Sequence, residues 1–131
     1  MENSKILSMK KIDRCYTAKK KQALSSILEQ YISIPKSIYG DCLEKVILFG
    51  SYARGDFRSD SDIDIMLLLD IQPHKERECV KRLLDDTFDF NMENNIDIQP
   101  IPKSINTFQK WGNILPFYKE INKEGVVLYD K

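Results

Sequence analysis

Apolar residues recur along the chain at two spacings, which separate the expected helices from the expected strands. Helical spacing of three and four residues predicts one helix over about 13–31 and another over about 73–90. Dense apolar runs predict a buried strand over 43–49 and a central strand over 62–69. The alternation of apolar and polar residues in 96–101 predicts a third strand.

The remaining segments are shorter and complete a mixed domain. Residues 105–111 and 115–121 are predicted to be short helices, and 125–129 a last strand. Pro100 moves the third strand towards a sheet edge, because proline lacks the N–H that a central strand donates. Together these elements predict a mixed α/β (α+β) fold around one sheet, spanning residues 1–131 as a single domain.

Some local features refine this pattern. Pro35 and Gly40 predict a loop before the first strand. The buried stripe of the second long helix is expected to consist of Val80, Leu83, Leu84 and Phe88. Four aromatic residues are expected to lie in the core or to contact a partner rather than to stack on a nucleobase: Phe108, Trp111, Phe117 and Tyr118.

The overall charge balance excludes one broad class of function. The 131 residues hold 20 Lys+Arg and 20 Asp+Glu, so the formal net charge is zero. A general nucleic-acid binder carries a basic surplus, so direct nucleic-acid binding is not indicated. No stretch reaches the ~18 apolar residues of a membrane span. The polar N-terminal region also lacks the apolar core of a signal peptide, so we expect a cytoplasmic protein without membrane contact.

The cysteines and the histidine do not form a zinc motif. Cys15, Cys42 and Cys79 are widely and irregularly spaced, and His74 is the only histidine. A Cys/His zinc site needs close ligand pairs such as CxxC, which the chain lacks. We therefore expect reduced thiols, as in other cytosolic proteins.

The zero net charge hides an acidic middle segment. Residues 1–45 hold nine basic and five acidic residues, whereas 54–97 hold six basic and twelve acidic ones. Residues 98–131 hold five basic and three acidic residues. The candidate chemistry lies in this acidic middle segment.

Asp62 and Asp64 are the first residues that need a chemical explanation. At positions i and i+2 of a strand their side chains share one face, while Ile63 and Ile65 point to the packed face. Neighbouring carboxylates repel each other, and a divalent cation reverses that repulsion. Mg²⁺ prefers carboxylate oxygens and keeps positions open for water and phosphate. The alternative is an exposed strand edge with incidental acids, because a DxD alone is common.

Asp97 lies in the third predicted strand with the same alternation. If that strand pairs beside 62–69 in a suitable register, three carboxylates share one sheet face and can hold two metal ions. Such a site suits phosphoryl transfer, and Asp97 could also take the proton of an acceptor hydroxyl. The alternative is an incidental acid near a turn.

Gly50 and Ser51 follow the first predicted strand directly and open a turn or short helix. Free N–H groups at the start of a helix bind phosphate well, and glycine lets the backbone approach closely. The Ser51 hydroxyl can add one more donor. An ordinary helix-capping serine is the alternative.

The joint spacing of these residues is far more specific than its parts. Gly50-Ser51, ten intervening residues and Asp62-x-Asp64 resemble the GSx10DxD motif of the DNA polymerase β-like nucleotidyltransferase superfamily. A polymerase β-like nucleotidyltransferase core with flanking helices is therefore the fold that the resemblance implies.

Longer strings narrow the resemblance to the minimal nucleotidyltransferase (MNT) group of that superfamily. GSYARG at 50–55 and SDID at 61–64 are similar to the group's motifs, and so are the IDI context of Asp97 and the terminal EGVVLYD. The resemblance covers about 43–130, which is the expected catalytic core behind the N-terminal helix over about 13–31.

The resemblance implies a role for each matching residue. Gly50 and Ser51 would hold the β- and γ-phosphates of a nucleoside triphosphate, with ATP as the substrate. Asp62 and Asp64 would ligate two Mg²⁺ ions. Asp97 would be the third metal ligand and would activate the acceptor hydroxyl.

Arg54 and the short chain complete what the resemblance implies. Arg54 lies in the ARG element of the motif and would brace the turn or touch phosphate. Larger members of the superfamily carry extra domains that grip the acceptor, so here a partner protein is the economical acceptor. Small MNT proteins resemble the antitoxin half of HEPN/MNT toxin–antitoxin pairs, in which AMP passes from ATP to a tyrosine of the HEPN toxin.

Two alternatives remain open on the sequence alone. One is a binding module that neutralises its partner by forming a complex without catalysis. The other is a stand-alone nucleotidyltransferase that modifies a small molecule, for example an aminoglycoside.

Overall fold

The computed structural model describes residues 18–58 and 61–131. For residues 18–22 it describes the backbone only. The helices are α2 (Ala18–Tyr31), α3 (Ser33–Tyr39), α4 (Ser51–Arg54), α5 (Val80–Asn94), α6 (Ile105–Trp111) and α7 (Pro116–Glu124), with short 3₁₀ helices at Gly40–Cys42 and Pro73–Lys75. The strands are β1 (Leu43–Phe49), β2 (Ile63–Leu69), β3 (Ile98–Ser104) and β4 (Val126–Asp130).

The strands form one mixed sheet in the order β3-β2-β1-β4. β1 runs antiparallel to both of its neighbours, whereas β2 and β3 are parallel. The strand with Pro100 lies at the sheet edge, as predicted, and an edge strand tolerates proline because one of its sides has no neighbour. The prediction of a mixed α/β (α+β) fold around one sheet is confirmed.

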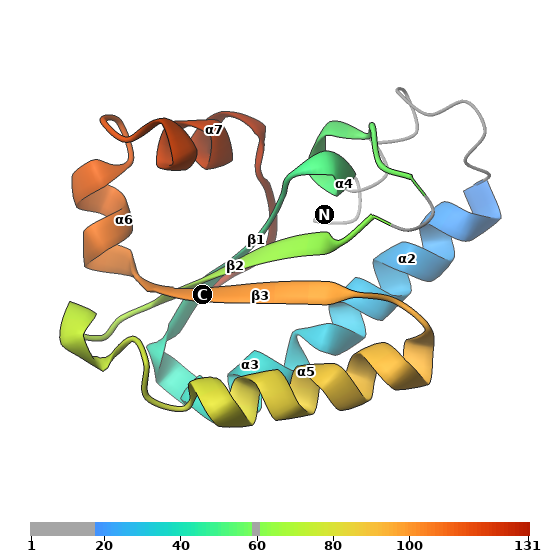
Figure 1. Ribbon diagram of the computed structural model, residues 1–131, viewed down its shortest axis with the longest axis horizontal. Coiled ribbons are helices and arrows are strands. Elements are labelled where there is room, and N and C mark those ends of the chain that lie inside the picture. Colours follow the sequence, from blue (N-terminus) through green and yellow to red (C-terminus); the bar gives the residue numbers. More distant parts are fainter. Residues whose placement is uncertain (1–17, 59–60) are drawn as a thin grey trace.

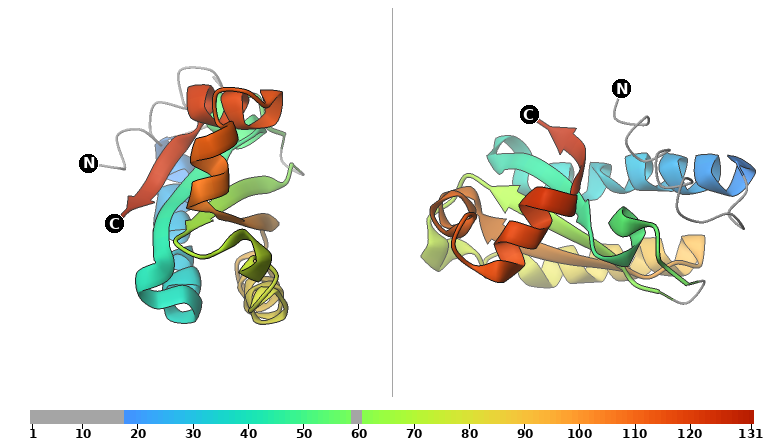
Figure 2. Two further views of the ribbon diagram at one scale, coloured as in Figure 1. Left: turned by 90° about the vertical axis from the view of Figure 1, so that its left-hand side faces the viewer. Right: turned by 90° about the horizontal axis from the view of Figure 1, so that it is seen from above.

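Helices cover the two faces of the sheet unequally. Figure 1 shows α2, α3 and α5 on one side of the sheet, and α6 and α7 on the other. The left view in Figure 2 shows the same separation, with the sheet between the two groups of helices. The two faces therefore have separate hydrophobic cores.

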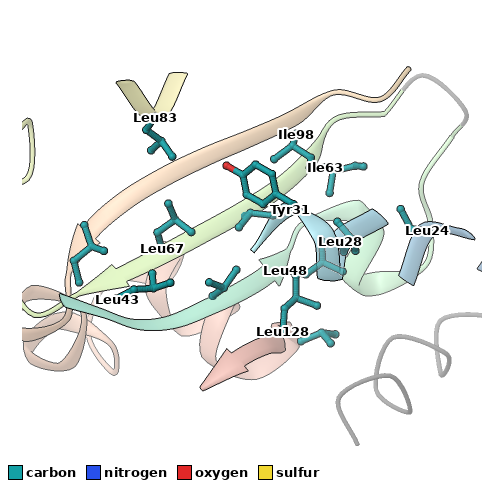
Figure 3. Close-up of a cluster of buried hydrophobic side chains, with 14 residues drawn as sticks. Leu24, Leu28, Tyr31, Leu43, Leu48, Ile63, Leu67, Leu83, Ile98 and Leu128 are labelled. Atoms are coloured by element: carbon teal, nitrogen blue, oxygen red, sulfur yellow. The ribbon is translucent and has the colours of Figure 1, made fainter. Parts of the chain in front are cut away.

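The first core lies under α2, α3 and α5. In Figure 3, Tyr31 of α2 lies near Ile63 of β2 and Ile98 of β3. The buried residues of this core are Leu24, Leu28, Tyr31, Leu43, Val46, Leu48, Ile63, Ile65, Leu67, Leu69, Leu83, Ile98, Val126 and Leu128. Ile63 and Ile65 thus face the packed side, as the alternation around Asp64 predicted.

The second core lies under α6 and α7. Its buried residues are Ile47, Phe49, Met66, Leu68, Phe108, Tyr118 and Ile121. β1 and β2 therefore send alternate side chains into both cores, which explains why both strands are apolar almost without interruption. Phe108 and Tyr118 are core residues, as expected, whereas Trp111 and Phe117 are exposed.

The predicted loop at Pro35 is wrong, because 33–39 forms helix α3. Pro35 is the third residue of this helix, where the N–H that proline lacks would have no intrahelical acceptor. The Ser33 hydroxyl donates to the Gln30 carbonyl at 2.8 Å, across the junction between α2 and α3. The loop prediction overlooked that proline is tolerated in the first turn of a helix.

The helix predicted to begin at residue 73 begins at Val80 instead. Cys79 has a positive φ of 68°, so a left-handed residue separates the 3₁₀ turn at Pro73–Lys75 from α5. Before that break, the Glu76 carboxylate accepts the Ser104 N–H at 2.8 Å and lies 3.5 Å from Lys103 Nζ. These contacts to β3 replace the helical turn that the local pattern predicted.

The predicted apolar stripe of α5 is wrong in two of its residues. Leu83 is buried, but Leu84 and Phe88 are 50% and 62% exposed. Thr87 faces the core in their place, and its hydroxyl lies 2.8 Å from the Tyr31 hydroxyl. A buried hydrogen bond therefore lets a polar residue take a core position that the apolar pattern assigned elsewhere.

Asn91 of α5 holds the beginning of β3. Its side-chain oxygen accepts the Ile98 N–H at 2.9 Å, and its side-chain nitrogen donates to the Ile98 carbonyl at 3.1 Å. The strand predicted over 96–101 accordingly begins two residues later, at Ile98, and extends to Ser104. Asp97 lies just before the strand.

Several other expectations meet the structure only in part. No helix in the described ranges is long and apolar enough to cross a membrane, and the cytoplasmic location stays a prediction. Cys42 and Cys79 are free thiols. Cys15 and the first part of the helix predicted over 13–31 lie outside the described residues.

Two tyrosines of the first core, the buried Tyr31 and the half-buried Tyr39, allow a stability test. Tyr31→Phe removes the hydroxyl that pairs with Thr87, so we expect the free energy of unfolding to fall by about 1 kcal/mol. Tyr39→Phe is the control, because the buried Tyr39 hydroxyl has no hydrogen-bond partner among the described residues. Denaturant unfolding measures both variants, and an equal loss of stability in the two would contradict the role of the Tyr31–Thr87 pair.

Candidate active site

The site begins where β1 ends. Gly50 follows Phe49 and leads directly into the short helix α4. Its φ of 78° and ψ of −154° are accessible to glycine and strained for other residues. The Gly50 carbonyl accepts the N–H groups of Ala53 and Arg54, both at 3.1 Å, and so closes the turn. The strand, the turn and the short helix thus form as the sequence predicted.

Antiparallel pairing brings this turn to the acidic part of the motif, since Phe49 pairs with Asp64. A Cβ atom on Gly50 would clash with Asp64 Oδ2, because the two would lie closer than real Cβ atoms approach oxygen. The Asp64 carboxylate therefore occupies the space that any side chain at position 50 would need. Glycine is required here for two reasons, its positive φ and this close approach.

A cavity of about 430 Å³ opens beside the turn. Its lining combines the turn and Asp64 with one side of α7, and consists of Phe49, Gly50, Ser51, Arg54, Asp64, Phe117, Glu120, Ile121 and Glu124. Gly50, Ser51, Arg54 and Asp64, which are four of the six predicted site residues, thus line one cavity. Its volume lies within the range of small-molecule sites.

Burial changes the electrostatics of Asp64. Desolvation of the partly buried carboxyl raises the pKa of Asp64, and the nearby positive charge of Arg54 opposes that rise. An ionised Asp64 without a cation is therefore less stable in the fold than it would be in water. A bound cation would relieve that cost.

Asp62 and Asp97 lie outside the cavity lining, and both are exposed. The parallel register pairs Ile63 with Ile98, and the Ile63 N–H donates to the Asp97 carbonyl at 2.8 Å. Asp62 directly precedes Ile63, and Asp97 directly precedes Ile98, so the two acids lie on neighbouring segments. The Asp97 carboxylate accepts the Gln99 side-chain N–H at 2.6 Å.

The carboxylates do not form a three-ligand metal cluster in this structure. Within residues 18–58 and 61–131, no three His, Cys, Asp or Glu side chains lie close enough together to hold a metal ion. Mg²⁺ commonly binds through one or two carboxylates, waters and substrate phosphates, and Asp62 and Asp64 offer the hard oxygen ligands that it prefers. The donor chemistry fits Mg²⁺, and the role of Asp97 as a third ligand stays a prediction.

Arg54 braces the turn against α7. Its Nε donates to Asp56 Oδ2 at 3.2 Å, and its Nη1 lies 3.7 Å from Glu124 Oε1. The hydrogen bond to Asp56, with the charges of Glu124 and Glu120, raises the pKa of Arg54. Bracing is one of the two roles expected for Arg54, and contact with phosphate stays a prediction.

Sequence reasoning missed the α7 residues of the cavity. Phe117, Glu120 and Glu124 lie more than fifty residues beyond the Asp62-x-Asp64 motif. The one available signal was their spacing, because positions 117, 120, 121 and 124 recur on one side of a helix. That spacing identifies a helix face, but it does not show what the face meets.

Comparisons with known proteins identify the family to which the chain belongs. Residues 22–131 match the family model described as Polymerase beta, Nucleotidyltransferase. The chain therefore belongs to this nucleotidyltransferase family, as the GSx10DxD motif predicted, and its mixed sheet is the polymerase β-like fold. The prediction that the protein is a nucleotidyltransferase enzyme, of the MNT type, is confirmed.

Two relatives come from Methanocaldococcus jannaschii. "Putative protein adenylyltransferase MJ0604" is 33% identical over 102 residues, which cover 78% of this chain and 94% of the relative. "Putative protein adenylyltransferase MJ0141" is 34% identical over 103 residues, which cover 76% of this chain and 93% of the relative. The matches therefore extend over nearly the whole of both relatives.

A solved structure described as a toxin-antitoxin with AMP-PNP resembles the chain more distantly. It is 18% identical, with a TM-score of 0.49, over 79% of this chain and 73% of that chain. A likeness at this level adds nothing about activity.

Substitution of Gly50 tests the close approach to Asp64. We expect Gly50→Ala to reduce nucleotidyl transfer by at least about a hundredfold, because the new Cβ displaces the Asp64 carboxylate. Gly40→Ala is the matched control, since Gly40 also has a positive φ (56°) but a Cβ there would meet no atom within 4 Å. Activity assays with thermal unfolding measure both variants. An equal loss of activity in the two variants would show that strain at positive φ, and not the contact with Asp64, causes the defect.

Asp64→Asn should stabilise the free protein while it removes activity. Because desolvation raises the pKa of Asp64, its ionisation opposes folding at neutral pH, and asparagine carries no charge. We expect a higher melting temperature at pH 7 without divalent cations, and a difference that disappears as the pH falls below the ordinary pKa of 3.8. Calorimetry across this pH range checks the effect, and a lower melting temperature at pH 7 would contradict it.

Proposed function

We propose that this nucleotidyltransferase transfers AMP from ATP to a hydroxyl group of a partner protein, with release of pyrophosphate. One observation carries the proposal: the Gly50-Ser51 turn and the Asp64 carboxylate lie against each other and line one cavity. The relatives named for protein adenylyltransferase activity support a protein as the acceptor.

In this proposal the phosphates lie at the turn. The first N–H groups of a helix have no intrahelical acceptor, so the Ser51 N–H would donate to a phosphate oxygen, together with the Ser51 hydroxyl. Arg54, at the end of the same helix, would hold the turn in place through Asp56 and Glu124. The chain thus presents donors to the triphosphate without a basic surface.

The transfer is an in-line displacement at the α-phosphorus. The acceptor oxygen forms a bond to this phosphorus, the bond to the bridging oxygen breaks, and pyrophosphate leaves with that electron pair. The hydroxyl proton passes to a carboxylate, for which we propose Asp97. The product is an AMP diester on the partner.

The carboxylates Asp62, Asp64 and Asp97 would hold Mg²⁺, which we propose as two ions. Bound Mg²⁺ would neutralise phosphate charge and increase the electrophilicity of the α-phosphorus. Asp64 has a further reason to bind a cation, because its carboxylate is partly desolvated.

The partner that fits best is a HEPN-type toxin, with a tyrosine as the acceptor, and residues 1–131 would act as a single-domain antitoxin. The MNT-type strings at 50–55 and 61–64 support this choice. Neutralisation by complex formation without catalysis is the competing function, and the two differ in whether Asp64 is needed.

Labelled ATP tests the transfer directly. The chain is incubated with Mg²⁺ and a HEPN-type protein encoded beside it, and we expect label from [α-³²P]ATP but not from [γ-³²P]ATP to appear on that protein. Asp62→Asn and Asp64→Asn should each reduce labelling by at least about a hundredfold. Asp70→Asn, at the other end of β2 and exposed, is the matched control and should label normally.

Two results would refute the catalytic proposal. One is a partner that stays unlabelled with the unaltered chain. The other is an Asp64→Asn chain that still protects cells from the toxin as well as the unaltered chain does, because protection would then come from complex formation.

A further inference from the structure

The cavity at the candidate active site has a wall that phosphate binding does not use. This wall belongs to α7 and consists of Phe117, Glu120 and Glu124, together with the buried Ile121. A triphosphate held at the Gly50-Ser51 turn needs neither an aromatic ring nor further carboxylates. Glu124 Oε1 of this wall lies 3.7 Å from Arg54 Nη1 of α4, so the wall adjoins the Gly50-Ser51 turn.

Phe117 is an exposed aromatic ring in a defined orientation. Its side chain is 50% exposed, although its ring centroid lies 5.7 Å from that of Phe49 in an edge-to-face contact at 87°. The centroid of the Phe117 ring also lies 5.6 Å from that of the Tyr118 ring. Two neighbouring rings thus orient Phe117 while half of its surface remains open, which is the form of a stacking platform.

Glu120, on the same side of α7 as Phe117, feels the charge of Arg54 but makes no ion pair among the described residues. Arg54 contacts Asp56 and Glu124, and in the part of the chain that the structure describes no basic group lies within ion-pair distance of Glu120. An ionised carboxylate can only accept hydrogen bonds. A nucleotide group that hydrogen-bonds to Glu120 therefore donates an N–H or O–H.

We propose that Phe117 and Glu120 form the nucleobase subsite of the cavity and select a base that carries an exocyclic amino group, such as adenine. The base stacks on the Phe117 ring, and its amino group donates to the Glu120 carboxylate. This inference rests on the proposed function, since it assumes that a nucleoside triphosphate occupies the cavity.

The same contacts discriminate against uracil. Uracil presents a carbonyl oxygen where adenine and cytosine present an amino group, and a carboxylate repels that oxygen. Stacking, in contrast, tolerates every base, because each base has a π-face. Phe117 therefore contributes affinity, and Glu120 contributes the choice of base.

Nucleotide affinity tests the two residues separately. Dissociation constants for a non-hydrolysable ATP analogue and for its UTP counterpart are measured with the full chain and Mg²⁺, by calorimetry. We expect the unaltered chain to prefer the ATP analogue. Phe117→Ala should weaken both nucleotides about tenfold, whereas Phe117→Tyr should keep the original affinity.

Glu120→Gln should change the preference itself. The glutamine amide can donate to the uracil oxygen, so we expect weaker binding of the ATP analogue, tighter binding of the UTP analogue and a ratio that falls about tenfold. The matched controls lie on α5, on the other side of the sheet: Phe88→Ala removes an exposed phenylalanine, and Glu93→Gln removes an exposed glutamate. Both controls should bind like the unaltered chain.

The results distinguish this subsite from the proposed function. If Phe117→Ala and Glu120→Gln leave both affinities unchanged while Asp64→Asn weakens the ATP analogue, the subsite is wrong and nucleotide binding at the turn stands. If the unaltered chain binds neither nucleotide, both proposals are wrong. If Glu120→Gln weakens both nucleotides equally, Glu120 does not select the base.

Discussion

The antiparallel pairing of β1 with β2 is the constraint on which the site depends. Its register sets Phe49 opposite Asp64, so the turn at Gly50 meets the Asp64 carboxylate. Side chains alternate between the two faces of a sheet, so a shift of one residue would move Asp64 into the core under α5. Ile63 and Ile65 are almost completely buried in that core, and their burial therefore maintains the register that the chemistry needs.

The unequal covering of the sheet explains where the cavity lies. On one face, α2, α3 and α5 bury the strands along their length, whereas α6 and α7 cover the other face only in part. Met66 and Leu68 lie under these two helices, but Asp64, two residues earlier on the same face, lines an open cavity. The raised pKa of Asp64 is the cost of its position between a packed core and solvent.

Local patterns predicted the strands, the turn and α6 well, but they predicted α3 and the start of α5 poorly. The strand over 43–49 and the helix over 105–111 have the predicted bounds, because each is a dense or periodic apolar segment with a clear end. The predictions for residues 33–39 and for the start of α5 were wrong for different reasons. Pro35 lies where a helix tolerates it, and contacts between Glu76 and β3 replace a helical turn. The buried Tyr31–Thr87 pair has no apolar signal at all.

The sequence by itself determined the class of enzyme and the residues of its motif, because their chemistry depends on short spacings along one strand, one turn and the next strand. Only the tertiary structure decided which side chains face that motif. Phe117, Glu120 and Glu124 reach the cavity because α7 packs against β1 next to the Gly50 turn, and the distance along the chain hides this contact. The position of Asp97 also depends on tertiary structure, since the two hydrogen bonds between the Asn91 side chain and the Ile98 backbone set where β3 begins. The contact between α7 and the motif joins segments far apart in sequence, and local periodicity carries no information about it.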